Sequence, residues 1–78
     1  MTVTITYAGY GVWNSTFDVT QPVQNAYNGG TRTFFANNEW AGDPYPHARK
    51  YLFIIWQQNG TVSSGVVGER DDTGIALP

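Results

Sequence analysis

The sequence contains no cysteine and only one histidine among its 78 residues. Without cysteine there is no disulfide to compensate for a small core, and no thiolate for a metal centre or for nucleophilic attack. We therefore expect neither a cofactor nor a metal site. Apolar packing alone must hold the chain together, although a domain of this size buries only about 60% of the surface that its unfolded chain exposes.

Charge is scarce as well, since Asp, Glu, Lys and Arg make up 13% of the residues, against about 25% in an average domain. The four basic residues are too few to cover a phosphate backbone, which takes about six or more contacts, so a nucleic-acid partner is disfavoured. No apolar run approaches the ~18 residues of a membrane helix. The first 20 residues lack the pattern of a signal peptide. We expect no membrane insertion and a cytoplasmic location.

Hydrophobic residues, in contrast, reach 41% of the chain and aromatic residues 15%. Alternation of apolar and polar residues predicts strands, separated by glycine, proline and asparagine turns. The expected strands are 2–7, an edge around 12–19, 31–36, 49–57, 61–67 and 75–77, with one short helical turn at 21–27. This pattern is typical of a single all-β domain over residues 1–78, a small antiparallel β-sandwich of five to six strands.

Three local expectations follow from the pattern. Residues 2–7 alternate strictly, which places Val3, Ile5 and Tyr7 on one face. Asp18 and Thr20 are expected to cap the helical turn through their side-chain oxygens. The nearly continuous apolar strand 49–57 is expected to be central, covered on both faces, and to hold Trp56 in the core.

The open sheet edges of such a sandwich can pair with other chains, and natural proteins protect them with charge or proline. The expected edge segments, 2–7 and 61–67, contain neither. We therefore expect a homodimer or a larger homo-oligomer.

Short motifs in a fixed order suggest a relationship. They are Tyr10-Gly11, Asp18-Val19-Thr20, Val23-Gln24, Gly42-Asp43-Pro44 with Pro46, then Lys50, Leu52 and Ile54, Val67-Gly68-Glu69 and Leu77-Pro78. In this order the chain, from about residue 5 to 78, resembles the small β-sandwich domain at the C-terminus of a DnaJ-type mitochondrial co-chaperone, which also occurs as free-standing or appended microbial modules. The resemblance implies a fold and brings no catalytic set. The chain departs from it in being far more aromatic.

Part of that aromatic excess falls in the proline-rich loop 37–48. Flat rings beside amides and carboxylates suit sugar recognition, because a ring covers C–H patches while polar groups bind hydroxyls. The candidate ligand-binding residues are Asn38, Glu39, Trp40, Asp43, Tyr45 and His47, together with Trp13. Two alternatives stay open: Trp40 could instead close an open end of the sandwich, and Asp43 could serve only to start a turn.

Catalysis is not expected. His47 lies between Pro46 and Ala48 in a loop, with no sign of a Ser-His-Asp set. Glu39 and Asp43 could form a glycosidase pair, but a domain of this size has little room for a substrate cleft. The sequence favours a non-enzymatic, lectin-like module that binds a glycan. The alternative is a protein-interaction or self-assembly module, whose aromatic residues would form a contiguous apolar patch.

Overall fold

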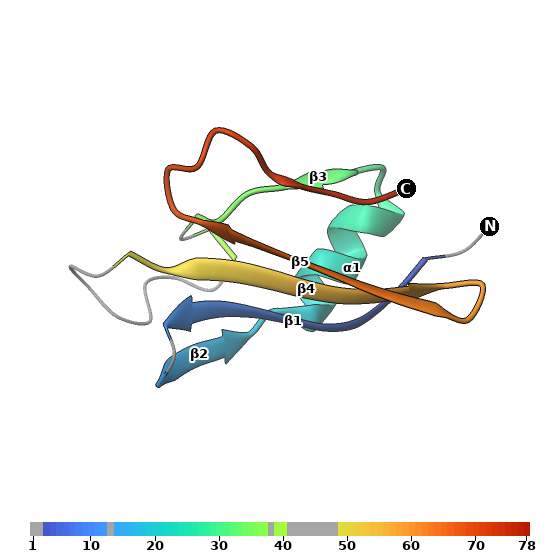
Figure 1. Ribbon diagram of the computed structural model, residues 1–78, viewed down its shortest axis with the longest axis horizontal. Helices are drawn as coiled ribbons and strands as arrows, with labels where there is room; N and C mark the ends of the chain where they lie inside the picture. Colours follow the sequence, from blue (N-terminus) through green and yellow to red (C-terminus); the bar gives the residue numbers. More distant parts are fainter. Residues whose placement is uncertain (1–2, 13, 38, 41–48) are drawn as a thin grey trace.

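The computed structural model describes residues 3–12, 14–37, 39–40 and 49–78. In these residues the chain forms two antiparallel sheets and one helix (Figure 1). The elements are β1 (Thr4–Val12), β2 (Ser15–Asp18), α1 (Thr20–Asn28), β3 (Thr33–Phe34), β4 (Tyr51–Gln58), β5 (Thr61–Gly68) and β6 (Ile75–Ala76). One sheet has the strand order β2-β1-β4-β5, and the other pairs β3 with β6. The predicted all-β fold with one short helix is confirmed.

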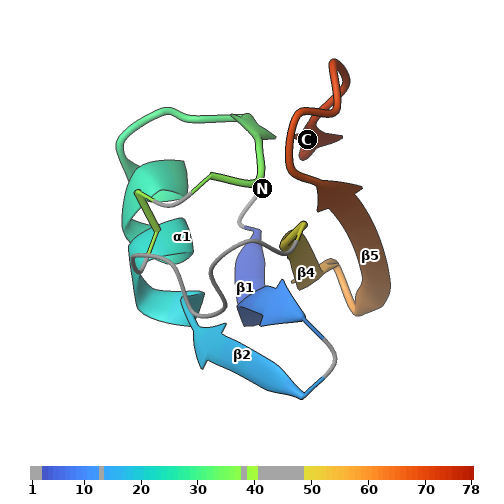
Figure 2. The same cartoon turned by 90° about the vertical axis from the view of Figure 1, so that its left-hand side faces the viewer.

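The core lies between the four-stranded sheet and a layer formed by α1 and the β3–β6 sheet (Figure 2). The sheet contributes apolar side chains from β1, β4 and β5. The helix contributes Val23 and Tyr27, and the small sheet contributes Phe34 and Ile75. The four-stranded sheet and the layer opposite it thus bury these apolar side chains against each other.

The alternation of β1 is interrupted by a bulge. Ile5 pairs with Trp56 while Tyr7 pairs with Ile55, so Thr6 is an extra residue in β1. A single extra residue exchanges the two faces of the strand beyond it. Ala8 and Tyr10 therefore enter the core, and the prediction that Tyr7 shares a face with Val3 and Ile5 is wrong.

The start of α1 also differs in part from expectation. Asp18 Oδ1 accepts the backbone N–H of Thr20 at 2.9 Å, as predicted. Thr20 itself does not cap the helix: its Oγ1 accepts the backbone N–H of Ala8 in β1, also at 2.9 Å. Val19, the residue immediately before the helix, supplies no side-chain hydrogen bond to the first turn. Thr20 thus joins helix to sheet instead of closing the helix end.

Strand β4 is central, as predicted, with β1 on one side and β5 on the other. Its coverage on both faces is not confirmed. Leu52 and Ile54 are fully buried, whereas Phe53 and Ile55 are half-buried and Tyr51 is exposed. No described element packs on the second face, which we call the outer face of the sheet.

The edges of the four-stranded sheet are β2 and β5. Residues 61–67 are therefore an edge, as predicted. Of the other predicted edge, 2–7, the described residues Thr4–Tyr7 of β1 have β4 on one side and no strand on the other, because β2 pairs only with Gly9–Val12. The part of β1 that extends beyond β2 is bonded to the α1 segment. Gln24 Oε1 accepts the N–H of Ile5 at 2.9 Å, and the N–H of Val19 donates to the carbonyl of Ala8 at 2.8 Å.

Candidate functional site

Most of the sequence-predicted site falls where the structure gives no description. Of the candidate ligand-binding residues, Trp13, Asn38, Asp43, Tyr45 and His47 lie outside the described residues. Glu39 and Trp40 lie within them and are neighbours at a turn. Glu39 is exposed, and its backbone N–H donates to Asn37 Oδ1 at 2.9 Å.

Trp40 packs against the core. Its ring lies 5.9 Å from the ring of Phe34, centroid to centroid. Its Nε1–H donates to the carbonyl of Phe35 at 2.8 Å, so the polar group of the indole is used inside the protein. These contacts favour the structural alternative for Trp40, in which the ring closes an open end of the sandwich.

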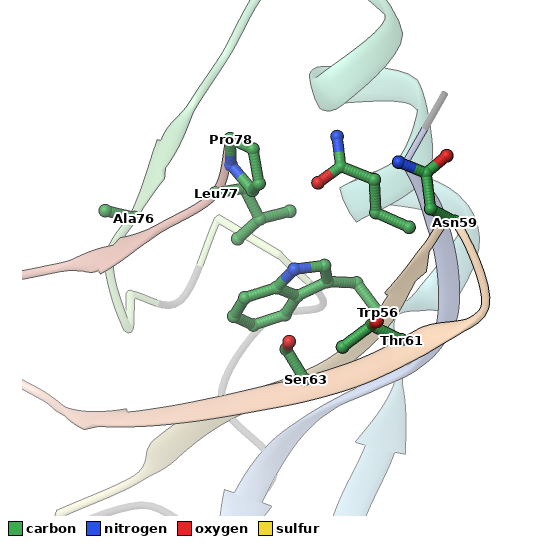
Figure 3. Close-up of a pocket in the computed structure, with 8 residues that line it drawn as sticks. Trp56, Asn59, Thr61, Ser63, Ala76, Leu77 and Pro78 are labelled. Carbon is green, nitrogen blue, oxygen red and sulfur yellow. The ribbon is translucent and has the colours of Figure 1, made fainter. Parts of the chain in front are cut away.

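A pocket of about 540 Å³ lies around a second described tryptophan, Trp56. It is formed by the end of the β4–β5 hairpin and by the last residues of the described chain. The residues that line it are Trp56, Gln58, Asn59, Thr61, Ser63, Ala76, Leu77 and Pro78. Figure 3 shows the indole of Trp56 in the middle of this set, with Leu77 and Pro78 on one side and Ser63 on the other.

The register of the hairpin explains why these side chains meet. Trp56 pairs with Ser63, and Gln58 pairs with Thr61. Opposed residues of an antiparallel pair project to the same face, so all four side chains follow the core-facing row of Leu52 and Ile54. The two-residue turn has positive φ at both positions, 54° at Asn59 and 80° at Gly60, as the predicted Asn-Gly hairpin requires.

The opposite wall is held by contacts with α1 and β3. The backbone N–H of Leu77 donates to the carbonyl of Arg32 at 2.8 Å. The hydroxyl of Tyr27 donates to the carbonyl of Pro78, also at 2.8 Å. Within this wall the Leu77 side chain is buried, whereas Pro78 is exposed. The pocket therefore has two walls that are fixed by separate parts of the fold.

Several polar groups of the pocket lining other than Asn59 are not used by the protein. Within the described part of the chain, the side chains of Gln58, Thr61 and Ser63 and the Nε1–H of Trp56 make no hydrogen bond to another residue. Amides on α1 behave differently: Gln21 donates to Asn25 at 2.8 Å and Gln24 donates to Asn28 at 3.1 Å. The pocket thus offers uncommitted donors and acceptors beside an aromatic ring, and its lining includes no ionisable side chain.

Charged residues gather instead where β4 begins. The Lys50 side chain is 5% exposed, and its Nζ lies 3.3 Å from Oε1 of Glu69, whose side chain is 22% exposed. The backbone N–H of Lys50 donates to the same oxygen at 2.8 Å. This backbone hydrogen bond is the main reason why the pKa of Glu69 lies below its ordinary value of 4.5, and the Lys50 ammonium adds to the effect.

The lowered pKa of Glu69 predicts a loss of stability in acid. Because the folded protein binds the Glu69 proton less readily than the unfolded chain does, this stabilisation is complete above the unfolded pKa and is lost as pH falls through the folded pKa. We expect the free energy of unfolding to decrease below about pH 4.5. Urea titrations between pH 3 and 7 should show a shallower decrease for Glu69→Gln, and equal slopes for both proteins would contradict the prediction.

Among the described residues there is no group of three or more His, Asp or Glu side chains that could hold a metal ion. The same residues include no helix of the length and apolar character that crossing a membrane requires. Comparison with protein-family models, with curated proteins and with solved structures found no match to this chain. The resemblance to the co-chaperone domain therefore stays a prediction.

Sequence reasoning assigned Trp56 to the core, and the structure bears this out only in part. The side chain is half-buried, packs against the core and also lines the pocket. The sequence did contain a signal for this second role. Trp56 is followed by Gln57, Gln58 and Asn59, and a two-residue turn after Gln58 brings Ser63 opposite the ring.

Proposed function

We propose that this protein is a non-enzymatic, lectin-like module that binds a neutral carbohydrate in the pocket around Trp56. The observation that supports the proposal is the indole beside the uncommitted amide of Gln58 and the uncommitted hydroxyls of Thr61 and Ser63. A sugar has both C–H faces, which pack on aromatic rings, and hydroxyls, which exchange hydrogen bonds with amides and hydroxyls. The aromatic and polar pattern expected for the loop recurs here within described residues.

The chemistry of the lining defines the class of ligand. Gln58, Thr61 and Ser63 provide both donors and acceptors, whereas the Trp56 indole provides a donor only. With no ionisable side chain in the lining, nothing would offset the cost of desolvating a charged ligand. A neutral ligand with several hydroxyl groups matches this set. The volume of about 540 Å³ lies within the ~300–1,000 Å³ of small-molecule sites.

The pocket walls should favour ligand affinity because contacts within the protein hold them in position before a ligand binds. Leu77 and Pro78 are anchored through Arg32 and Tyr27, and the hairpin has a tight two-residue turn. A site that needs little ordering on binding loses less entropy. We therefore expect the unliganded and liganded proteins to share the same wall geometry.

A glycan array followed by calorimetry on the best neutral glycan tests the proposal. We expect Trp56→Ala to weaken binding at least tenfold, because truncating an aromatic anchor at the centre of a binding site costs about 2 kcal/mol or more and about 1.4 kcal/mol is tenfold. Gln58→Ala and Ser63→Ala should each weaken it about threefold to tenfold, because each removes one hydrogen-bonding group. Gln21→Ala, which removes an exposed amide on α1, is the matched control and should bind normally.

Two further results would overturn the proposal. If no neutral glycan binds on a broad array, the lectin function is wrong. If binding is lost in Trp40→Ala but kept in Gln58→Ala and Ser63→Ala, the site is in the loop and not in this pocket. Circular dichroism of each variant separates loss of binding from loss of the fold.

A further inference from the structure

The outer face of the four-stranded sheet carries a continuous set of apolar side chains. Its members are Tyr7 on β1, Tyr51, Phe53 and Ile55 on β4, and Val62 and Val66 on β5. The rings of Tyr7 and Phe53 lie 5.6 Å apart, and Phe53 covers Gly9, where a Cβ would come within 2.7 Å of the ring. Val62 and Val66 are the most exposed large apolar residues described, at 63% and 68%.

Both valines lie on β5, which is an open edge of the sheet. On its other side β5 has no strand partner in the described chain, since β6 pairs with β3. Residue Ile75 of β6 instead contacts β5 from the core side, at Gly65. Side chains of α1 bond to the N–H groups of β1, but the outer edge of β5 receives no backbone hydrogen bond from another described element.

The sequence of β5 does nothing to discourage a partner strand. Residues 61–68 include no charge, no proline and no bulge, and all eight pair regularly with β4. Charged residues, prolines and bulges are the features by which natural edge strands avoid association. A second strand can pair with such a regular, uncharged edge through backbone hydrogen bonds and cover its exposed valines.

The strand is also complementary to itself. In an antiparallel pair, residues opposite each other project to the same face. When two copies of β5 pair about a two-fold axis at Ser64, Val62 of each copy lies opposite Val66 of the other, and the hydroxyl-bearing Ser64 side chains meet on the axis. Both valine pairs then lie on the outer face, which continues across the junction.

We propose that two copies of this chain form a dimer by antiparallel pairing of their β5 strands, with Ser64 at the two-fold axis. The dimer has one eight-stranded sheet and a shared apolar outer face. A single strand pair buries less surface than the ~1,600 Å² of a standard interface. We therefore expect a micromolar dissociation constant.

Paired charge substitutions test both the dimer and its register by sedimentation velocity. Val62 and Val66 are four residues apart on one strand, about 13 Å at the usual rise, so they do not contact each other within a chain. In V62K/V66K every cross-strand pair becomes lysine opposite lysine, and we expect dissociation to a monomer. In V62K/V66E every pair becomes lysine opposite glutamate, and we expect the dimer to return and to weaken as salt is added.

Thr31→Lys adds a charge at an exposed position outside β5 and should leave the dimer intact. A wild-type protein that sediments as a monomer at millimolar concentration would overturn the proposal. The β5 register would be wrong if V62K/V66K and V62K/V66E dissociate equally. If both double variants remain dimeric, the interface lies elsewhere. Circular dichroism should show all of these variants folded, because the substituted side chains are exposed.

Discussion

Replacing Glu69 with alanine is expected to lower the free energy of unfolding by about 3 kcal/mol. The substitution removes the carboxylate that pairs with the buried ammonium of Lys50 and accepts the Lys50 backbone N–H. Removing one partner of a buried ion pair costs more than removing both, because the desolvation of the remaining ion is less well offset. Urea unfolding at pH 7 measures the change.

The double variant Lys50→Met with Glu69→Ala separates the cost of losing the ion pair from the cost of losing the backbone hydrogen bond. Removing both charges takes away the desolvation penalty, and methionine keeps most of the apolar stem of the lysine. We expect the double variant to recover more than half of the lost free energy. If it is as unstable as Glu69→Ala alone, the lost backbone hydrogen bond accounts for the effect instead.

Replacing Gly11 with alanine is expected to cost about 3 kcal/mol, the upper part of the usual range for overpacking. A Cβ on Gly11 would lie 2.1 Å from the carbonyl oxygen of Ser15 and 2.7 Å from Cα of Thr16. Both are backbone atoms of β2, so no side chain can turn away, and the two strands must separate. Thermal unfolding of the purified variant measures the loss.

Gly60→Ala is the matched control for this contact. Gly60 also has a positive φ, 80°, but nothing lies within 4 Å of its Cβ position. Its substitution should cost about 1 kcal/mol, from backbone strain alone. Equal losses at Gly11 and Gly60 would contradict a role for the close approach of β1 and β2.

The fold class could be predicted because its signals are local. Residues 51–58 and 61–68 reveal their pairing through an apolar run, an Asn-Gly turn and a second extended run. The bulge at Thr6 could not be predicted, since a strictly alternating segment gives no sign that one residue is extra. For the same reason Tyr7 was predicted on the wrong face of the strand.

The candidate site likewise has one part that depends on neighbouring residues and one part that depends on residues distant in the sequence. The turn places Trp56 opposite Ser63, which the sequence alone allows one to derive. The wall of Leu77 and Pro78 depends on the pairing of β6 with β3 and on Tyr27, 51 residues earlier in the chain. No periodicity reports such a contact, so Trp56 was expected to serve the core alone.

The position of the pocket on the β4–β5 hairpin has a further consequence. Thr61 and Ser63 face the core side of β5, whereas Val62 and Val66 face the outer side. A two-fold axis normal to the sheet keeps these sides distinct, so the proposed dimer would present both pockets in the same direction. Two weak sites on one rigid body can raise avidity for a repeating glycan by about 10²–10⁴. Modest affinity at each site would then suffice on a surface that displays the sugar densely.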